Sequence, residues 1–337
     1  MAEPLRIALV GAGGRIAGDW RRAAAGMPEV RITALVETDP HARARLSTED
    51  AALLADPDAL CHRDDVDAAI VATPPATHVA LGELLLAAGR DVLCEKPLAV
   101  DLAGATRLLD AAKASGRVLM MASKFRFVDD VEEARRRIAA GDIGEPVLYE
   151  NTFCGILDMR GRWNSDPRIS GGGVLIDNGA HAADLARVLV GEIARVFAVA
   201  GPRVQPLEVE DSARITFRTL RDCVGTATLS WSVATGDPAY ARVHGSEGSI
   251  ELGWRSMRIR ARGHGEWTEC GHGYDKLAAF RTQLRHFARC ARGQEAMRPT
   301  AGDALDSVRF VAAAQLSMQQ QRWVGLRDQA LGEETPA

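Results

Sequence analysis

Short runs of apolar residues alternate with helical patterns in the first part of the chain. Each run leaves no polar face and is too short for a helix, so it predicts a buried strand. The predicted strands are residues 5–10, 31–36, 67–72, 92–94 and 118–122. The predicted helices run from the first strand to about Gly26 and over 40–54, 77–88 and 101–115. This alternation is typical of a doubly wound parallel sheet, an α/β fold.

The pattern changes near Lys124. A charged helix is followed by longer strand-like segments, as in an α+β domain with a largely antiparallel, open-faced sheet. The helix is 129–140, the strands are 147–153, 195–200, 212–219, 224–232 and 239–243, and closing helices are predicted over 275–292 and 302–323. We therefore predict one domain over 1–123, a second over 124–325 and a polar tail over 326–337. The open sheet face favours a homodimer or homotetramer.

Composition narrows the choice of partners. The chain has 337 residues, of which 47% are hydrophobic and 26% charged, as in a soluble protein with two cores. A formal net charge of −4 argues against nucleic acid or an anionic membrane as the main partner. No apolar run approaches the roughly 20 residues that span a bilayer. The N-terminus enters a strand at once, which leaves no room for a signal peptide.

The cysteines also indicate a cytoplasmic protein. All 6 are scattered without a CxxC pair, which is typical of reduced thiols in a cytoplasmic protein. The tightest group that could bind a metal is His264, Cys270 and His272, and its spacing fits no standard zinc signature. We therefore predict a cytoplasmic protein without a metal site.

A glycine-rich turn, GAGGRI, follows the first predicted strand and opens a helix. Strand, glycine turn and helix are what a dinucleotide pyrophosphate needs, because the phosphates sit on the positive end of the helix. Gly11 provides the tight turn and Gly13 the close approach of the backbone, whereas the third glycine of the fingerprint is replaced by Ile16. The predicted contacts of this Rossmann domain with the cofactor are Gly11, Gly13, Gly14, Arg15 and Ile16.

An acid, Glu37, ends the second predicted strand. A carboxylate there accepts hydrogen bonds from the adenosine ribose hydroxyls and repels a 2′-phosphate, so it predicts NAD over NADP. Three arginines nearby in the sequence, Arg15, Arg43 and Arg45, leave NADP possible, because a guanidinium pairs well with phosphate.

The segment DVLCEKPL, residues 91–98, delivers Glu95 and Lys96 at the carboxyl end of a buried strand, where open α/β sheets bind ligands. Pro97 stops the strand and holds the lysine at a defined angle. The alternative is a strand-end charge pair facing water. Thr73 and Pro74 end the preceding strand beside the expected cofactor path.

The helix after Thr73 and Pro74 raises two further expectations. Thr77 can cap it, and His78 either reaches the cofactor or lies in its first turn.

A second ionisable group lies in SGGGVLIDNGAHAADLARVLVG, residues 170–191. If this segment is helical, Asp177, His181 and Asp184 line one face, and the carboxylates can orient the imidazole. Ionisable groups on a buried helix are costly unless they have a function. The alternative is a helix whose histidine is satisfied by its own acids.

Taken in order, GAGG, TPPATH, VLCEKPLA, KFRF and GGGVLIDNGAHAAD resemble the glucose-fructose oxidoreductase / inositol dehydrogenase family (Gfo/Idh/MocA type) over nearly the whole chain. The resemblance implies that Lys96 lies between nicotinamide and substrate, with Glu95 near the nicotinamide ribose. It also implies that Asp177 and His181 face the substrate. Further cofactor or substrate contacts implied by it are Thr73, Pro74, His78, Arg126 and Trp163.

The expected activity is hydride transfer between NAD, with NADP possible, and a secondary alcohol or ketone of a sugar, cyclitol or nucleotide sugar. Our hypothesis is that His181, oriented by Asp177, exchanges the proton while Lys96 stabilises the alkoxide. Which of Lys96 and His181 is the base stays open. Two alternatives are an NAD-dependent glycosidase of the same family and a non-catalytic NAD-binding regulator.

Overall fold

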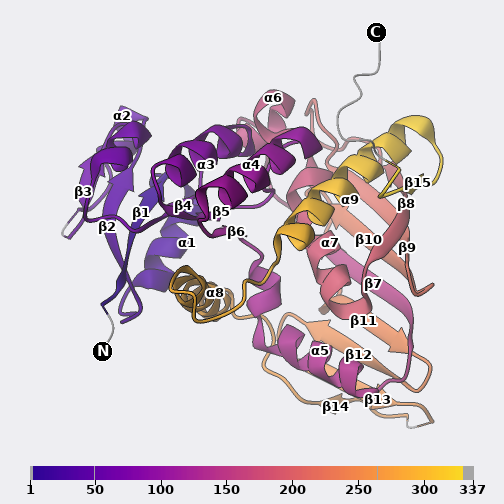
Figure 1. The fold of residues 1–337 in the computed structure, drawn as a ribbon. Coiled ribbons are helices and arrows are strands. Elements are labelled where there is room, and N and C mark those ends of the chain that lie inside the picture. The colour runs from indigo at the N-terminus through magenta and orange to yellow at the C-terminus, as the bar shows by residue number, and fades with distance from the viewer. Residues whose placement is uncertain (1–2, 49, 264, 329–337) are drawn as a thin grey trace. The chain divides into compact units, whose positions relative to one another are not determined.

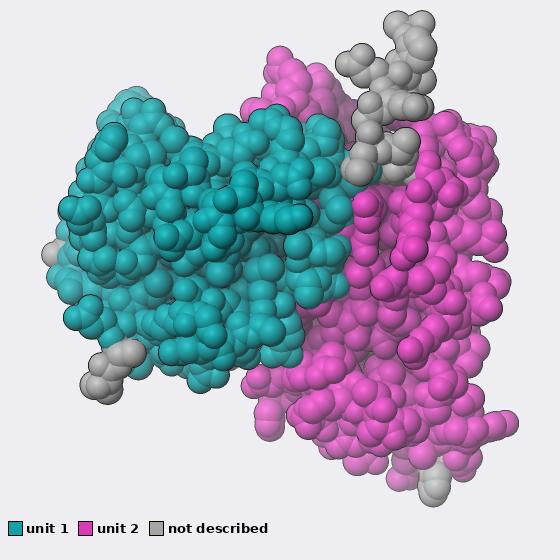
Figure 2. Space-filling model, in the orientation of Figure 1, with its two compact units in different colours: residues 1–124, 276–305 teal, residues 125–275, 306–337 magenta. Residues whose placement is uncertain are grey.

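The computed structural model describes residues 3–48, 50–263 and 265–328, and divides the chain into two compact units. Unit 1 comprises Met1–Lys124 and Lys276–Leu305, and unit 2 comprises Phe125–Asp275 and Asp306–Ala337 (Figure 2). The first boundary lies next to the one predicted at 123. The second unit is interrupted, however, because residues 276–305 return to unit 1. No helix in the described part of the chain is long and apolar enough to span a membrane.

Unit 1 contains a six-stranded sheet in the order β3-β2-β1-β4-β5-β6, in which every pair is parallel (Figure 1). Its strands are β1 (Leu5–Val10), β2 (Val30–Val36), β3 (Ala52–Leu54), β4 (Ala68–Val71), β5 (Asp91–Cys94) and β6 (Leu119–Met121). The strand order reverses direction at β1 and β4, so the carboxyl ends of these two strands form the edge where such folds bind ligands. The predicted doubly wound parallel sheet is confirmed.

Helices cover this sheet. They are α1 (Arg15–Ala24), α2 (Pro40–Arg43), α3 (His78–Ala87), α4 (Leu102–Ser115) and α8 (Lys276–Ala291), with 3₁₀ turns at Pro57–His62 and Pro75–Thr77. A further 3₁₀ turn, Lys124–Phe127, begins at the boundary residue Lys124 and continues into unit 2. The prediction of a helix over 40–54 is wrong: the segment forms only α2 and, after a turn, β3. The apolar residues at its end add a strand to the edge of β2, with Leu35 opposite Leu53. This pairing overrides a weak helical pattern.

Thr77 stands at the start of α3 as predicted, but its hydroxyl does not cap the helix. The Thr77 Oγ1 instead donates to the carbonyl oxygen of Pro74 at 2.8 Å. The turn Pro75–Thr77 ahead of the helix directs the hydroxyl back to the strand end.

α8 belongs to unit 1 because its apolar face completes the core beside α1. The ring centroids of Trp20 and Phe280 are 4.2 Å apart in an edge-to-face arrangement. Phe287 and Leu284 lie in the same core and are fully buried. A segment late in the sequence therefore provides the helix that covers the glycine-turn side of the core.

Unit 2 contains a nine-stranded sheet in the order β14-β13-β12-β11-β7-β10-β9-β8-β15. Within the described residues of this second sheet only β7 and β10 pair in parallel, so the predicted largely antiparallel sheet is confirmed. The strands are β7 (Pro146–Cys154), β8 (Ile193–Ala200), β9 (Ser212–Thr219), β10 (Val224–Ser230), β11 (Ala239–Gly245), β12 (Gly248–Gly253), β13 (Met257–Ala261), β14 (Thr268–Glu269) and β15 (Val324–Gly325). The last four were not predicted.

Helices pack on unit 2's sheet, and α7 contacts β7, β9 and β10 along its length (Figure 1). The helices are α5 (Asp129–Ala140), α6 (Pro167–Ser170), α7 (Val174–Val190) and α9 (Ala301–Gln320), with a 3₁₀ turn at Trp163–Ser165. Near the end of α9, Ser317 Oγ accepts a hydrogen bond of 3.0 Å from the backbone N–H of Ala198 in β8. The predicted tail, 326–337, lies largely outside the described residues.

Candidate functional site: a dinucleotide edge and an ionisable helix

The glycine turn between β1 and α1 has no space for side chains. Gly11 has φ +80°, and a Cβ there would lie 2.8 Å from Thr73 Cγ2 and 3.0 Å from the carbonyl oxygen of Ala72. A Cβ on Gly13 would lie 2.8 Å from Glu37 Oε2. Positive φ and the short distances require glycine at position 11, and the short distance alone favours it at position 13. The turn is therefore built for a close backbone approach, as the fingerprint predicts.

The first turn of α1 is open to an anion. Within the described residues no side chain caps α1, and its first turn contains no acid. The unpaired N–H groups of a helix start carry partial positive charge and bind phosphate. Ala17 is fully buried and faces the core, whereas Ile16, in the place of the third glycine, packs at the margin of the core. The small side chain of Ala17 thus provides the close packing that the third glycine of the fingerprint would provide.

Glu37 is held at the glycine turn by backbone donors. Its Oε2 accepts from the N–H of Gly13 at 2.8 Å, and its Oε1 accepts from the N–H of Asp39 at 3.0 Å. Arg43, one of the arginines that left NADP possible, donates through Nη1 to the carbonyl oxygens of Glu37 at 2.7 Å and Thr38 at 3.2 Å. The carboxylate therefore has a fixed position at the end of β2, and the Arg43 guanidinium is engaged with backbone.

Lys96 is the exception in a buried segment. From Asp91 to Ala99, all of which the structure describes, every residue except Lys96 is buried. Glu95 is only 7% exposed. Its Oε1 accepts from Trp20 Nε1 at 2.8 Å, and its Oε2 accepts from the backbone N–H of Lys96 at 3.2 Å. Burial raises the pKa of Glu95, against the opposing effects of Lys96, Trp20 and Lys124.

His78 supports this segment from behind. Its side chain is fully buried, with Nδ1 at 2.8 Å from the carbonyl oxygen of Pro97 and Nε2 at 2.9 Å from that of Thr73. Burial lowers the pKa of His78. The ring thus ties the end of β4 to the residue after Lys96. Of the two roles considered for His78, the structure favours the place in the first helical turn, and a direct cofactor contact stays a prediction.

In unit 2, α7 presents Asp177 and His181 on one half-buried face. Asp184 is 3% exposed, and its Oδ1 accepts a 2.7 Å hydrogen bond from Nε of Arg126, which is also an ion pair. All three residues lie in the single helix α7 at separations of four and three, so they line one face as predicted, and Asp184 is the buried member that Arg126 engages. Asp177 is the acid that shares the half-buried face with His181.

Aromatic rings pack around His181. The imidazole centroid lies 5.3 Å from that of Phe125 and 6.5 Å from that of Phe153, edge to face in both cases. Phe125 also stacks on Tyr274 at 5.2 Å. These contacts restrict the ring to one orientation. The His181 imidazole therefore sits in an aromatic environment with Asp177 one helical turn away.

The start of α7 depends on a residue that sequence reasoning missed, Glu210. Its Oε1 accepts from the N–H of Gly173 at 3.1 Å and of Leu175 at 2.9 Å. A Cβ on Gly173 would lie 2.0 Å from the Glu210 carbonyl oxygen. Burial raises the pKa of Glu210. The triple glycine thus admits an acidic cap from a distant segment, and a glycine run directly before a helix was the available signal.

Two indole donors were also missed. Trp20 binds Glu95 in unit 1, and Trp231 Nε1 donates to Asp177 Oδ2 at 3.2 Å in unit 2. Both tryptophans are almost fully buried. No local sequence signal connects either tryptophan with its acid.

The loop that carries Trp163 is more exposed. Trp163 is 42% exposed in the short turn Trp163–Ser165, and its substrate contact stays a prediction. Arg160 pairs with the neighbouring Asp158, as surface residues commonly do. Among the described residues, no group of three or more His, Cys, Asp and Glu side chains is placed to bind a metal. His264, from the group considered above, lies outside the described residues.

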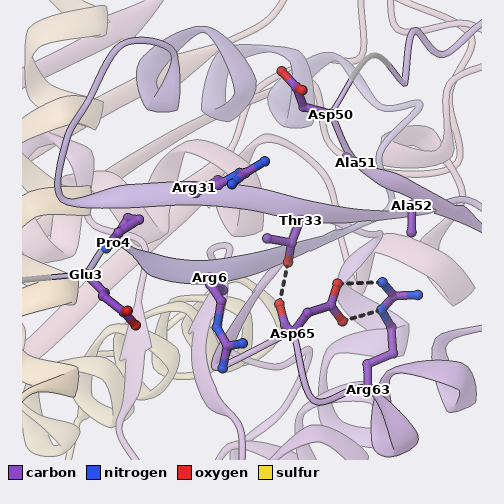
Figure 3. A pocket seen from close by; sticks show the side chains of 10 residues that line it. All are labelled: Glu3, Pro4, Arg6, Arg31, Thr33, Asp50, Ala51, Ala52, Arg63 and Asp65. Carbon is purple, nitrogen blue, oxygen red and sulfur yellow. Dashed lines mark hydrogen bonds and ion pairs between the residues drawn. The ribbon is translucent and has the colours of Figure 1, made fainter.

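A cavity of about 590 Å³ in unit 1 is a separate feature (Figure 3). It lies at the amino ends of the strands, lined by Arg6 of β1, Arg31 of β2 and Ala52 of β3. Arg63 is paired there with Asp65 at 2.6 Å. Doubly wound sheets bind ligands at the opposite edge. We therefore do not assign the cofactor to this cavity.

Comparisons with known proteins agree with the two units. Residues 5–123 match a family model described as an oxidoreductase family with an NAD-binding Rossmann fold, and residues 131–251 match the GFO/IDH/MocA C-terminal domain. The rhizopine catabolism protein MocA of Rhizobium meliloti is 30% identical over 315 residues, which cover 92% of this chain and 93% of that protein.

Two further proteins are similar over most of the chain. The scyllo-inositol 2-dehydrogenase (NAD(+)) of Bacillus subtilis is 28% identical over 255 residues, 70% of this chain and 71% of that protein. A crystal structure of an inositol dehydrogenase homolog complexed with NAD+ from Azotobacter vinelandii superposes with a TM-score of 0.87 at 25% identity, covering 96% of this chain and 98% of that one. The chain therefore belongs to the GFO/IDH/MocA family and is an oxidoreductase with an NAD-binding Rossmann domain.

Proposed function

We propose that the protein is an NAD-dependent dehydrogenase that oxidises a secondary hydroxyl of a sugar or cyclitol. The observation that carries the proposal is Lys96, the single residue between Asp91 and Ala99 that is not buried, at the carboxyl edge of a parallel sheet. A partly buried lysine at this edge suits a group that meets a substrate oxygen.

NAD fits the residues at this edge. The open start of α1 and the turn at Gly11 and Gly13 would hold the pyrophosphate, and Glu37 would accept from the adenosine ribose. Nicotinamide supplies the hydride acceptor at C4 when the cofactor is bound. Engagement of Arg43 with backbone carbonyls supports NAD as the preferred form. The predicted contacts of Arg15, Thr73 and Pro74 remain part of this proposal.

Oxidation of an alcohol also requires a proton acceptor and a group that stabilises the alkoxide. We assign the role of proton acceptor to His181, and Asp177 lies on the same half-buried face of α7. Lys96 carries the charge that opposes the alkoxide. A role reversal between Lys96 and His181 keeps the same overall chemistry, because both groups exchange protons with an alcohol.

A hydroxylated substrate is supported by the names of the relatives. The Bacillus subtilis relative is a scyllo-inositol dehydrogenase, and the Azotobacter vinelandii structure is an inositol dehydrogenase homolog. The aromatic rings next to His181 provide a flat surface, and sugar and cyclitol rings carry C–H faces that pack on such surfaces. Nucleotide sugars remain within the same class of substrate.

The test is a screen of the purified protein with NAD and with NADP against sugars, inositols and nucleotide sugars, following the absorbance of reduced nicotinamide. Lys96→Ala and His181→Ala should each reduce kcat at least about a hundredfold on the best substrate, as loss of a general acid–base or charge-stabilising group does. Binding of NAD, measured by calorimetry, serves as the control for folding. Near-normal turnover in either variant would show that the assigned residue does not take part.

The two alternative functions predict different results from the same protein. A glycosidase would cleave chromogenic glycosides without net formation of NADH. A regulator would bind NAD and show no turnover on any member of the panel. Either result would replace the dehydrogenase assignment.

We also propose that the protein forms a homodimer or homotetramer through the open face of the unit 2 sheet. Leu148 of β7 and Val199 of β8 are each 48% exposed, while their neighbours Tyr149 and Ala198 are buried against the helices. Exposed apolar side chains on one sheet face favour self-association. Light scattering should give a multiple of the 36.2 kDa chain mass, and Leu148→Lys should lower it.

The compartment is a further part of the proposal. All six cysteines are free, although Cys94, Cys223 and Cys290 are buried in cores where a secreted protein often places disulfides. Free thiols throughout the chain support a reducing compartment, the cytoplasm. Redox-sensitive labelling of the protein extracted from cells should find all of them reduced.

A further inference from the structure

The backbone of Trp231 is held by two hydrogen bonds. Its N–H donates to the carbonyl oxygen of Asp211 at 2.8 Å, and its own carbonyl oxygen accepts from the N–H of Leu157 at 2.7 Å. The residue follows the end of β10, and its side chain is 0% exposed. The indole therefore has one position, which is set by the sheet of unit 2.

The helix that carries Asp177 is equally fixed. Asp177 lies in the first turn of α7, and its N–H donates to the carbonyl oxygen of Gly173 at 3.2 Å. The start of this turn is held by the carboxylate of Glu210. Two rigid elements, the end of β10 and the start of α7, therefore meet where Trp231 Nε1 lies 3.2 Å from Asp177 Oδ2.

We propose that Trp231 is a positioning residue, which sets the rotamer of the Asp177 carboxylate through this hydrogen bond. An indole N–H donates a hydrogen bond, accepts none and does not ionise near neutral pH. It therefore orients the carboxylate without entering the reaction. Asp177 then presents its remaining lone pairs in one direction beside His181. This inference rests on the proposed dehydrogenase function, because it assigns the aligned carboxylate to the reacting site.

The mechanism predicts an effect on turnover more than on binding. A carboxylate that samples several rotamers is correctly placed for only a fraction of the time, and the reaction is slowed by that fraction. Replacing the indole by a ring without the N–H should therefore lower kcat about tenfold and leave KM for NAD unchanged, because the glycine turn and Glu37 lie in unit 1.

The experiment compares wild type with Trp231→Phe, using the substrate found in the screen. A second variant carries 3-benzothienylalanine at position 231, which keeps the size of indole and has sulfur in place of N–H, in case Phe leaves a cavity that disturbs folding. Trp323→Phe is the matched control, since Trp323 is 40% exposed and packs on Arg195 at the far strands of the sheet. The control should keep wild-type kcat.

A double variant and a spectroscopic signal complete the test. Asp177→Ala, which leaves no acceptor for the indole, should remove most of the effect of Trp231→Phe, because the two changes disrupt one interaction. Independently of activity, the chain has 6 tryptophans and hence 6 indole N–H signals in a nitrogen-15 spectrum. The signal that Trp231→Phe removes should move upfield in Asp177→Ala, because the hydrogen bond is lost.

The outcomes separate the two proposals. Unchanged kcat in both position 231 variants, or an indole signal that ignores Asp177→Ala, would overturn the positioning role. Absence of dehydrogenase activity in the wild type would overturn the proposed function, and with it the catalytic use of the aligned carboxylate. In that case the indole signal still decides whether Trp231 holds Asp177.

Discussion

The indole nitrogen of Trp20 lies 2.8 Å from Oε1 of Glu95, and both side chains are buried in unit 1. Trp20 belongs to α1, which follows the glycine turn, and Glu95 precedes Lys96 at the end of β5. This hydrogen bond therefore joins the helix that follows the glycine turn to the segment that carries the lysine. A buried carboxyl that loses its donor costs about 1–3 kcal/mol, so the bond is a sensitive point of the fold.

We predict that Trp20→Phe lowers the free energy of unfolding by about 2–4 kcal/mol, since the variant loses a donor and indole volume. A double-mutant cycle with Glu95→Ala, which leaves no acceptor for the indole, separates the two contributions. The coupling between the positions should be about 1–2 kcal/mol, measured by urea unfolding at neutral pH. Additive effects would show that the hydrogen bond contributes nothing to stability.

Glu95 should also give stability a dependence on pH. Burial raises its pKa in the folded protein above the unfolded value, so the folded state holds this proton more tightly. Its contribution to stability is then complete below the unfolded pKa and is lost as the pH rises through the folded pKa. The unfolding free energy of wild type minus that of Glu95→Gln should fall from pH 4 to pH 8, about the range that a buried carboxyl titrates over. A difference that rises with pH would contradict the assignment.

Glu37 should decide between NAD and NADP. Glu37→Ala removes the carboxylate that Gly13 and Asp39 hold at the end of β2, and we expect KM for NAD to rise about tenfold. Glu37→Gln is the matched variant, because it keeps an acceptor oxygen and removes only the charge. It should retain NAD binding and gain activity with NADP. If both variants keep the wild-type ratio of kcat/KM for the two cofactors, Glu37 does not determine the preference for NAD over NADP.

The approach of Glu210 to α7 makes Gly173 irreplaceable. Gly173→Ala places a Cβ 2.0 Å from the Glu210 carbonyl oxygen, and backbone must move to relieve the clash. We expect a loss of about 2–4 kcal/mol in unfolding free energy, together with displacement of the helix that carries His181. Gly155→Ala is the control, because a Cβ there meets no atom within 4 Å. The control should change stability by less than about 0.5 kcal/mol.

Strand ends and glycine turns made the unit 1 site predictable. Continuous apolar runs identify parallel strands, and the residues that follow them, Glu37, Thr73 and Glu95, must then meet at one edge. What the sequence could not provide were partners brought in by tertiary packing. The hydrogen bonds of Trp20 with Glu95 and of Glu210 with Gly173 join segments with no pattern in common.

The strands that were missed in unit 2 have a physical reason. β12 and β13 pair through charged residues, and Glu251 of β12 binds both Arg242 of β11 and Arg258 of β13. Both strands alternate apolar and polar residues, but over only 6 and 5 residues, and their charged members pair across the strands. The sequence also did not predict that α8 belongs to unit 1. Hydrophobic periodicity identifies a helix, but it does not identify the sheet that the helix covers.

The buried thiols allow a test of how the core of unit 1 opens. Cys94 is fully buried in β5 with its pKa well raised by burial, and burial raises the pKa of Cys290 in α8 to about 11. The thiolate is the reactive form, and with this pKa only about one Cys290 side chain in a thousand is a thiolate at pH 8 in the folded protein. We expect both residues to resist a disulfide reagent in the native protein and to react once urea unfolds it.

Saturating NAD should slow that reaction further, because a ligand that binds only the folded unit lowers the population of the open state by the factor 1 + [NAD]/Kd. Half-buried Cys61, outside the core cluster, should react promptly with or without NAD and serves as the internal control. Mass spectrometry after timed labelling assigns each site. Rapid labelling of Cys94 in the native protein would mean that β5 opens locally, and the fixed position inferred for Lys96 would then have to be abandoned.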